Sequence, residues 1–225
     1  MKKIGVILSG CGVMDGSEIH EAVLTLLAID KAGAAAVCMA PNIPQQEVVD
    51  HLTNETAKGE KRNILVEAAR IARGRIKDIA AVSASDVDAV VLPGGYGAAK
   101  NLCDFATAAD RCKVHPDVAR LIQEVHKQGK PVGAICIAPA ILASLFGKAQ
   151  ASLTIGTDKE TAAKLEKMGA KHKPCSVREF AVDEKLKLVT TPAYMLAERI
   201  SEAQEGIEKL VKKVVELAAE KVTAN

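Results

Sequence analysis

Short apolar runs alternate along the chain with segments whose apolar residues recur at helical spacing. The runs have the length of buried strands and cover residues 3–8, 36–40, 88–92, 132–135 and 153–155. The segments with helical spacing lie at residues 19–27, 63–73, 116–128, 139–146 and 157–168. Strands that alternate with helices predict an α/β fold, a mostly parallel sheet covered on both faces. Such sheets bind ligands beyond the carboxyl ends of their strands.

Three parts of the chain depart from this alternation. Residues 41–62 are polar and irregular, and we interpret them as an insertion. Two short apolar runs at 180–182 and 186–190 flank a charged turn and predict a hairpin. From about residue 197 the remainder of the chain has the pattern of a charged amphipathic helix. Because no repeat or linker interrupts the sequence, we expect a single domain over residues 1–225.

Composition narrows the class of ligand. Hydrophobic residues make up 48% of the chain and charged residues 26%, which is ordinary for a globular protein and excludes a disordered one. Aromatic residues are only 2%, so there is almost no material for a platform that stacks nucleic-acid bases. The 30 Lys and Arg are interspersed with 28 Asp and Glu, so no strong field for a phosphate polymer arises. We expect a small-molecule ligand and no nucleic-acid partner.

The cysteines and the longest uncharged run bear on the compartment. The six cysteines contain no Cys-x-x-Cys pair, and the N-terminus does not resemble an export signal. We therefore expect free thiols in the reducing cytoplasm. The uncharged run at 131–147 contains Gly133 and Pro139, which favours a strand, turn and helix over a membrane span. No His and Cys spacing is typical of a metal site, so we expect no metal.

Three loops follow predicted strands that should end at the ligand-binding edge: residues 9–16, 93–97 and 136–138. Cys136 lies between a buried strand and a helix, the position of a nucleophile elbow. A helix N-terminus favours the thiolate, so we expect a pKa for Cys136 below the usual value of about 8.5. The alternative is that Cys136 is one more small core residue. The elbow favours the nucleophile.

Candidate partners of this thiol come from the other two loops. Gly94 and Gly95 could turn backbone N–H groups toward the pocket and, with the N–H of Ile137, hold a developing oxyanion. Glu21 and Glu18 lie in the first helix, and either could place a buried carboxyl of raised pKa beside the sulfur. His20 lies between them and is more typical of a packing or surface residue.

Three segments carry a resemblance to a known family: residues 15–23 (DGSEIHEAV), 90–102 (VVLPGGYGAAKNL) and 134–140 (AICIAPA). Together they resemble the ThiJ/PfpI family of the class I glutamine amidotransferase-like superfamily, over nearly the whole chain. The resemblance implies a flavodoxin-like three-layer sandwich, a homodimer and a glyoxalase-like activity without a cofactor. It also implies roles for Cys136 as the elbow nucleophile, Glu21 as the contacting acid, and Gly95 and Ile137 as backbone oxyanion donors.

Departures from the relatives limit the chemistry. Protease-like members carry histidine directly after the nucleophile, where this chain has Ile137, so peptidase activity is disfavoured. Glutaminases need a His-x-Glu pair downstream, but the one histidine after Cys136 is His172, which is followed by Lys173 and Pro174.

Three functional hypotheses follow. The leading one is a glyoxalase-type lyase in which Cys136 adds to a small dicarbonyl and Glu21 moves a proton, so that glyoxal becomes glycolate. The second is a redox or metabolite sensor that uses the same thiol without turnover. The third is dinucleotide binding by the glycines of residues 10–16, whose spacing is one residue longer than the usual fingerprint. No acidic residue ends the second strand to bind a ribose, which disfavours that hypothesis.

Overall fold

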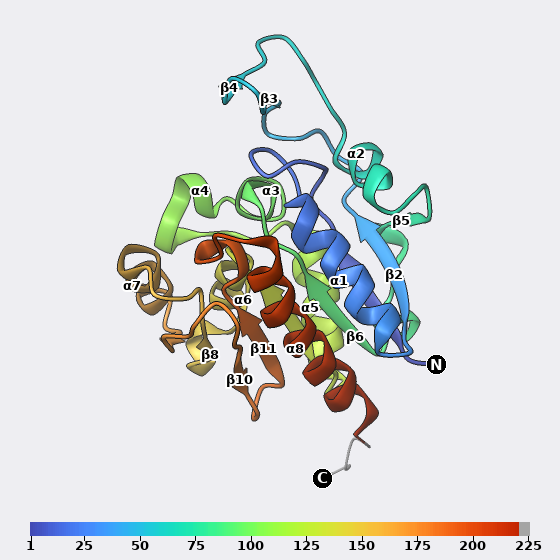
Figure 1. Cartoon of the computed structure of the whole chain (residues 1–225), viewed down its shortest axis with the longest axis vertical. Helices are drawn as coiled ribbons and strands as arrows, with labels where there is room; N and C mark the ends of the chain where they lie inside the picture. Colours follow the sequence, from blue (N-terminus) through green and yellow to red (C-terminus); the bar gives the residue numbers. More distant parts are fainter. Residues whose placement is uncertain (221–225) are drawn as a thin grey trace.

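A mostly parallel sheet forms the centre of the molecule (Figure 1). We describe residues 1–220 of a computed structural model. The seven strands of the sheet are β1 (Lys3–Ile7), β2 (Ala35–Ala40), β5 (Ile76–Asp78), β6 (Ala89–Leu92), β7 (Val132–Ile135), β10 (Ala181–Asp183) and β11 (Leu188–Thr191). Their order is β10-β11-β7-β6-β1-β2-β5, and every pair is parallel except β10 with β11.

Helices cover both faces of this sheet. They are α1 (Ile19–Lys31), α2 (Ile64–Ile71), α3 (Tyr96–Lys100), α4 (Phe105–Ala108), α5 (Pro116–Lys127), α6 (Pro139–Phe146), α7 (Lys159–Lys167) and α8 (Ile200–Ala219). One apolar core joins the sheet to α1, α2 and α8, and a second joins its other face to α5, α6 and α7. Figure 1 shows α1 and α8 on the near face, with α5 and α6 behind. The predicted flavodoxin-like three-layer sandwich is confirmed.

The strand order reverses between β1 and β6. From β1 the chain continues through β2 to β5 on one side of the sheet, whereas β6, β7 and β11 follow one another on the other side. Ligand crevices in open parallel sheets form at such a reversal, beyond the carboxyl ends of the strands. The loop after β1, the loop after β6 and the turn after β7 therefore converge there.

Several local elements differ from the expectations. The segment at 41–62 contains a short hairpin of β3 (Val49–Asp50) and β4 (Glu55–Thr56), and β8 (Ser152–Leu153) pairs with β9 (Lys171–His172) in a separate small sheet. The sequence analysis also missed the edge strand β5. Its residues Ile76, Lys77 and Asp78 are only partly buried or exposed, so no apolar run marks it. The predicted hairpin is present as β10 and β11.

The chain ends in the expected amphipathic helix, α8. Its predicted continuation to the last residue, and the end of the predicted single domain, fall on residues 221–225, which lie outside the described residues. That domain organisation stays a prediction. Within residues 1–220 no helix has the length and apolar character needed to cross a membrane.

Candidate active site

Cys136 lies at a strained turn directly after β7. Its φ is +61°, in the left-handed region that L-residues other than glycine seldom adopt. Its N–H donates to the carbonyl of Thr191, 2.9 Å away, which ties the turn to the end of β11. Within two residues the chain enters α6, where Pro139 fits the first turn. The strand, turn and helix thus form a nucleophile elbow that carries the sulfur at the sheet edge.

The strain predicts an unusual order of stability at this position. A left-handed conformation costs an L-residue about 1–2 kcal/mol, whereas glycine elsewhere is less stable than alanine by about 0.5–1 kcal/mol. We therefore expect Cys136→Gly to exceed Cys136→Ala in free energy of unfolding by about 1 kcal/mol, measured by urea denaturation. Ala134→Gly, in strand β7, serves as the control and should destabilise. If Cys136→Ala is the more stable variant, the turn is not strained.

Glu21 lies in the first turn of α1 and is fully buried. Its Oε2 accepts a hydrogen bond from the N–H of Gly94 at 2.9 Å, and its Oε1 accepts one from the N–H of Tyr194 at 3.1 Å. The carboxyl also lies beside Cys136, because a Cβ added at Gly94 would be 2.6 Å from its Oε2 and 2.5 Å from the Cβ of Cys136, and the two side chains shift each other's pKa. Three separate segments of the chain therefore fix this carboxyl beside the sulfur.

Burial dominates the ionisation of the pair. Burial, followed by repulsion from Glu18, raises the pKa of Glu21 from its ordinary value of 4.5 to about 8, so the carboxyl is mostly protonated at neutral pH. Burial also raises the pKa of the Cys136 thiol well above its ordinary value, and a charged Glu21 raises it further.

The raised pKa of the Cys136 thiol corrects our expectation that this pKa lies below the usual value. The N–H groups of Gly95 and Ile137 do favour the charged sulfur and lower the pKa of Cys136. The helix dipole is worth about 0.3–1 kcal/mol at an exposed terminus and up to ~2 kcal/mol in favourable, partly buried geometries, which is too little to offset the loss of hydration at this buried sulfur. At neutral pH the Cys136 side chain is therefore a protonated thiol.

The predicted oxyanion donors divide into two kinds. The N–H groups of Gly95 and Ile137 lie near enough to the sulfur to lower the pKa of Cys136. The N–H of Gly94 is instead occupied by Glu21. A Cβ at Gly94 would lie 2.5 Å from the Cβ of Cys136 and 2.6 Å from Oε2 of Glu21, so only glycine allows this close approach.

Glu18 and His20, the other two candidates on α1, have different places. The Oε2 of Glu18 caps the helix by accepting from the N–H of Glu21 at 2.6 Å, and its side chain lines the cavity described below. The Nδ1 of His20 lies 2.8 Å from the hydroxyl of Tyr194, at an exposed position outside that lining. Glu18 therefore borders the site, whereas His20 only holds the side chain of Tyr194.

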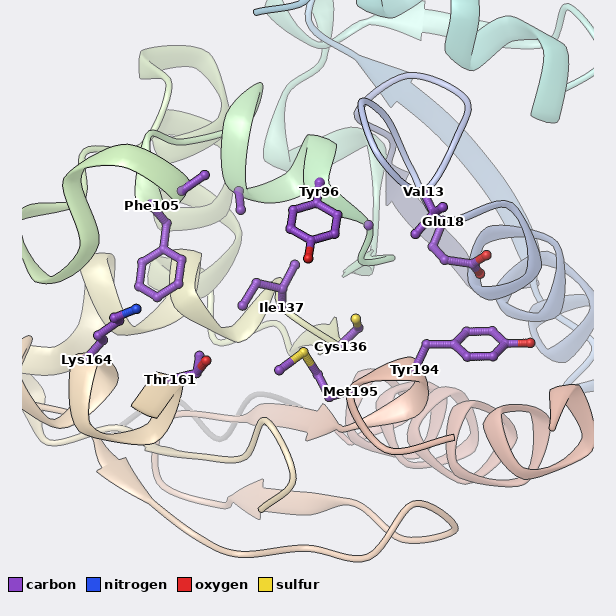
Figure 2. A pocket seen from close by; sticks show the side chains of 13 residues that line it. Val13, Glu18, Tyr96, Phe105, Cys136, Ile137, Thr161, Lys164, Tyr194 and Met195 are labelled. Atoms are coloured by element: carbon purple, nitrogen blue, oxygen red, sulfur yellow. The ribbon is translucent and has the colours of Figure 1, made fainter. Parts of the chain in front are cut away.

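Cys136 opens onto a cavity of about 320 Å³. Figure 2 shows the labelled side chains around it, with Glu18 and Tyr194 near the sulfur and Lys164 and Thr161 on the opposite side of Ile137. The lining consists of Val13, Glu18, Gly95, Tyr96, Ala99, Phe105, Ala106, Cys136, Ile137, Thr161, Lys164, Tyr194 and Met195. A small electrophile can thus reach the sulfur, although the Cys136 residue is only 8% exposed.

One wall of this site was not predicted from the sequence. Tyr194 directly follows Ala193, whose φ is +42°, in a short turn after β11. Because β11 runs parallel to β7, its carboxyl end lies at the same sheet edge as Cys136. The rule that ligands bind beyond the carboxyl ends of parallel strands selects this turn as well. The run at 186–190 was predicted only as one strand of a hairpin, so its pairing with the parallel sheet, and the turn after it, were not foreseen. The lining residues on α4 and α7 directly follow no strand of the main sheet, so no sequence pattern marked them as part of the cavity.

The glycines of the loop after β1 serve backbone packing. A Cβ at Gly12 would lie 2.7 Å from the ring of His51, and one at Gly16 would lie 2.3 Å from the N of Cys11. A Cβ at Gly97 would lie 2.5 Å from the Cα of Gly16, so this loop and the one after β6 meet backbone to backbone. The protein itself covers these glycines, which disfavours a phosphate cradle. Among residues 1–220 no group of three or more His, Cys, Asp or Glu is arranged to hold a metal ion.

Known proteins similar to this chain share both its sequence and its fold. The human glutamine amidotransferase-like class 1 domain-containing protein 3, mitochondrial, is 43% identical over 96% of this chain and 83% of its own length. The zebrafish (Danio rerio) ES1 protein, mitochondrial, is 31% identical over 96% of this chain and 86% of its length. The mitochondrial location belongs to those proteins, and the cytoplasmic location of this chain stays a prediction.

A solved structure and a family profile lead to the assignment. The crystal structure of an isoprenoid biosynthesis protein with an amidotransferase-like domain from Ehrlichia chaffeensis is 38% identical, covers 95% of this chain and 99% of its own, and has a TM-score of 0.88. Drosophila melanogaster DJ-1beta, at 23% identity and a TM-score of 0.53, shares the fold. The DJ-1/PfpI family profile matches residues 13–197. The chain therefore belongs to the DJ-1/PfpI family.

Proposed function

We propose that this protein is a glyoxalase-type lyase that converts glyoxal to glycolate through a hemithioacetal on Cys136. The observation that carries the proposal is the contact between the Cys136 thiol and the Glu21 carboxyl, at the wall of a cavity that admits a small molecule. The DJ-1/PfpI family includes glyoxalase-like enzymes and also non-enzymatic members. The geometry at Cys136 supports the enzymatic role.

The first step joins the sulfur to an aldehyde carbon. When Glu21 is ionised, it accepts the thiol proton, and the sulfur adds to one carbonyl of glyoxal. The carbonyl oxygen becomes an oxyanion, which the N–H groups of Gly95 and Ile137 near the sulfur can stabilise. Donors fixed before the reaction stabilise such charge without rearrangement. Glu21 then gives this oxygen the thiol proton, which completes the hemithioacetal and restores the carboxylate.

The second step moves hydrogen between the two carbons. Glu21 takes the proton from the carbon attached to sulfur and returns it to the neighbouring carbon, while the hydroxyl proton passes to the neighbouring carbonyl oxygen, which yields a thioester of glycolate. Water then cleaves the thioester and restores the thiol. Overall, glyoxal and water give glycolate and one proton. The reaction needs no external oxidant because one carbon is oxidised while its neighbour is reduced.

The sensor hypothesis has weaker support. Oxidation of cysteine by peroxide follows thiolate character and exposure, and Cys136 is buried with a raised pKa. A small aldehyde that enters the cavity can instead use Glu21 as the base. The predicted homodimer stays a prediction, independent of this choice.

The pH dependence of turnover tests the role of the pair. Because the pKa of Glu21 is raised to about 8, the base is present above that pH and protonated below it. We expect kcat/KM for glyoxal to rise about tenfold per pH unit below this value and to level off above pH ~8. Glycolate is quantified by proton NMR, with blanks that lack enzyme at each pH. A rate that is constant or falls between pH 6 and 9 contradicts the base role.

A further inference from the structure

The cavity is much larger than glyoxal. A water molecule occupies ~30 Å³ in the liquid, so glyoxal, with four heavy atoms, needs on the order of 100 Å³ of the available 320 Å³. Apart from Cys136, the lining consists largely of apolar side chains such as Phe105, Ile137 and Met195. A substrate that fills this space carries a hydrocarbon part beyond its reacting end.

The two ends of the cavity carry opposite charge. Within the described residues that line it, Lys164 is the basic side chain and Glu18 the acidic one. Figure 2 shows Glu18 on the side of Cys136 and Lys164 on the far side of Ile137. A substrate with a negative end is repelled from the sulfur side and attracted to the other. It would then present its uncharged end to the nucleophile.

Lys164 is available to bind such a group. Its Nζ lies 2.7 Å from Oε1 of Glu160, one helical turn earlier, and the Glu160 side chain is 81% exposed. Exposed pairs with this spacing contribute only about 0.3–0.5 kcal/mol. An anion inside a partly apolar cavity forms a stronger charge-assisted contact, because less water screens it.

We propose that the preferred substrates are α-oxoaldehydes with an anionic group at the end remote from the aldehyde, which Lys164 binds. This inference rests on the proposed function. A suitable probe is γ,δ-dioxovalerate, in which two methylene groups separate the dicarbonyl from a carboxylate. Cys136 adds to the aldehyde, the proton on that carbon moves to the ketone carbon, and water releases α-hydroxyglutarate. The aldehyde carbon is oxidised and the ketone carbon reduced, so water is the only co-reactant.

The experiment compares γ,δ-dioxovalerate with its neutral methyl ester. In the wild type we expect kcat/KM for the acid to exceed that for the ester about tenfold, mostly through KM. In Lys164→Gln this ratio should fall to about one, and in Lys164→Arg it should persist. Because each ratio is taken within one protein, a general loss of activity cancels. Lys167→Gln removes an exposed charge from the same helix outside the lining and should keep the wild-type ratio.

The outcomes separate this inference from the proposed function. If glyoxal is consumed but acid and ester react equally well, or Lys164→Gln keeps the preference, the anionic-substrate inference is wrong and the glyoxalase proposal stands. If no α-oxoaldehyde is consumed, the proposed function is wrong, and binding decides the inference instead. Calorimetry with the Cys136→Ser variant should then show that γ,δ-dioxovalerate binds more tightly than its methyl ester. This difference should disappear in the double variant that also carries Lys164→Gln. Equal binding would overturn the inference.

Discussion

Replacing Cys136 with alanine is expected to lower glyoxal turnover by at least about a thousandfold, because the covalent route is lost with the sulfur. The same loss is expected in Cys136→Ser, since a hydroxyl is far less acidic than a thiol and Glu21 is too weak a base to activate it. Both residues are small enough for the space that the thiol fills. Glycolate formation, followed by NMR with purified protein, measures the effect.

Two controls make this result specific. Cys175→Ala removes a half-buried thiol outside the cavity and should leave turnover unchanged. Unfolding in urea should show that Cys136→Ala remains folded. Residual activity of a few per cent or more in Cys136→Ala would mean that another group or a copurifying enzyme consumes glyoxal, and the proposed function would be abandoned.

Replacing Glu21 with glutamine is expected to separate activity from stability. The amide cannot accept the thiol proton, so turnover should fall by about 10²–10⁴-fold. At alkaline pH, however, the free energy of unfolding of Glu21→Gln should exceed that of the wild type. The folded protein keeps the Glu21 proton up to a pKa of about 8, whereas the unfolded chain releases it above 4.5. Folded protein thus binds more protons in this window, and the contribution of Glu21 to stability falls as pH rises through it.

The size of this effect follows from the pKa shift. Between pH 5 and 9 the wild type should lose about 4 kcal/mol through this one carboxyl, a loss that Glu21→Gln escapes. The amide leaves one of the N–H groups of Gly94 and Tyr194 without an acceptor, which costs about 1–3 kcal/mol at every pH. The variant should therefore be less stable than the wild type at pH 5 and more stable at pH 9.

Urea denaturation across this pH range tests the expectation. Glu166→Gln, which alters an exposed carboxylate of α7, should give a curve parallel to the wild type. An inactive Glu21→Gln protein that gains relative stability with rising pH cannot owe its inactivity to misfolding. Parallel curves for Glu21→Gln and the wild type would show that the carboxyl is not held protonated by burial, and the pH-dependent mechanism would be withdrawn.

The pattern of apolar runs was sufficient to predict a mostly parallel sheet covered on both faces, and the family resemblance added the flavodoxin-like architecture. Strands buried on both faces read as continuous apolar segments, as in β1, β6 and β7, and amphipathic helices mark the surfaces between them. The elements it missed are short and marginal. The edge strand β5 and the hairpin of β3 and β4 expose most of their side chains, so contacts made by the rest of the fold determine them.

Local sequence also identified the members of the site, because strand ends, glycines and the elbow are local features. It named Cys136, the two loop glycines and the pair Glu18 and Glu21 without showing which of them touch, and only the family resemblance singled out Glu21. Tyr194 and Lys164 lay beyond its reach, because their part in the cavity depends on how β11 and α7 pack against the elbow.

The sequence by itself determined the order of the main strands and helices, the sheet edge at which their loops meet and the cysteine that lies at the turn there. Tertiary structure alone decided the charge state of that residue. Ionisation depends on the hydration that a group loses when distant segments enclose it, and this loss outweighs the local helix dipole. It also decided which carboxyl of α1 faces the sulfur, because a turn after β11 and a glycine after β6 hold Glu21 in place.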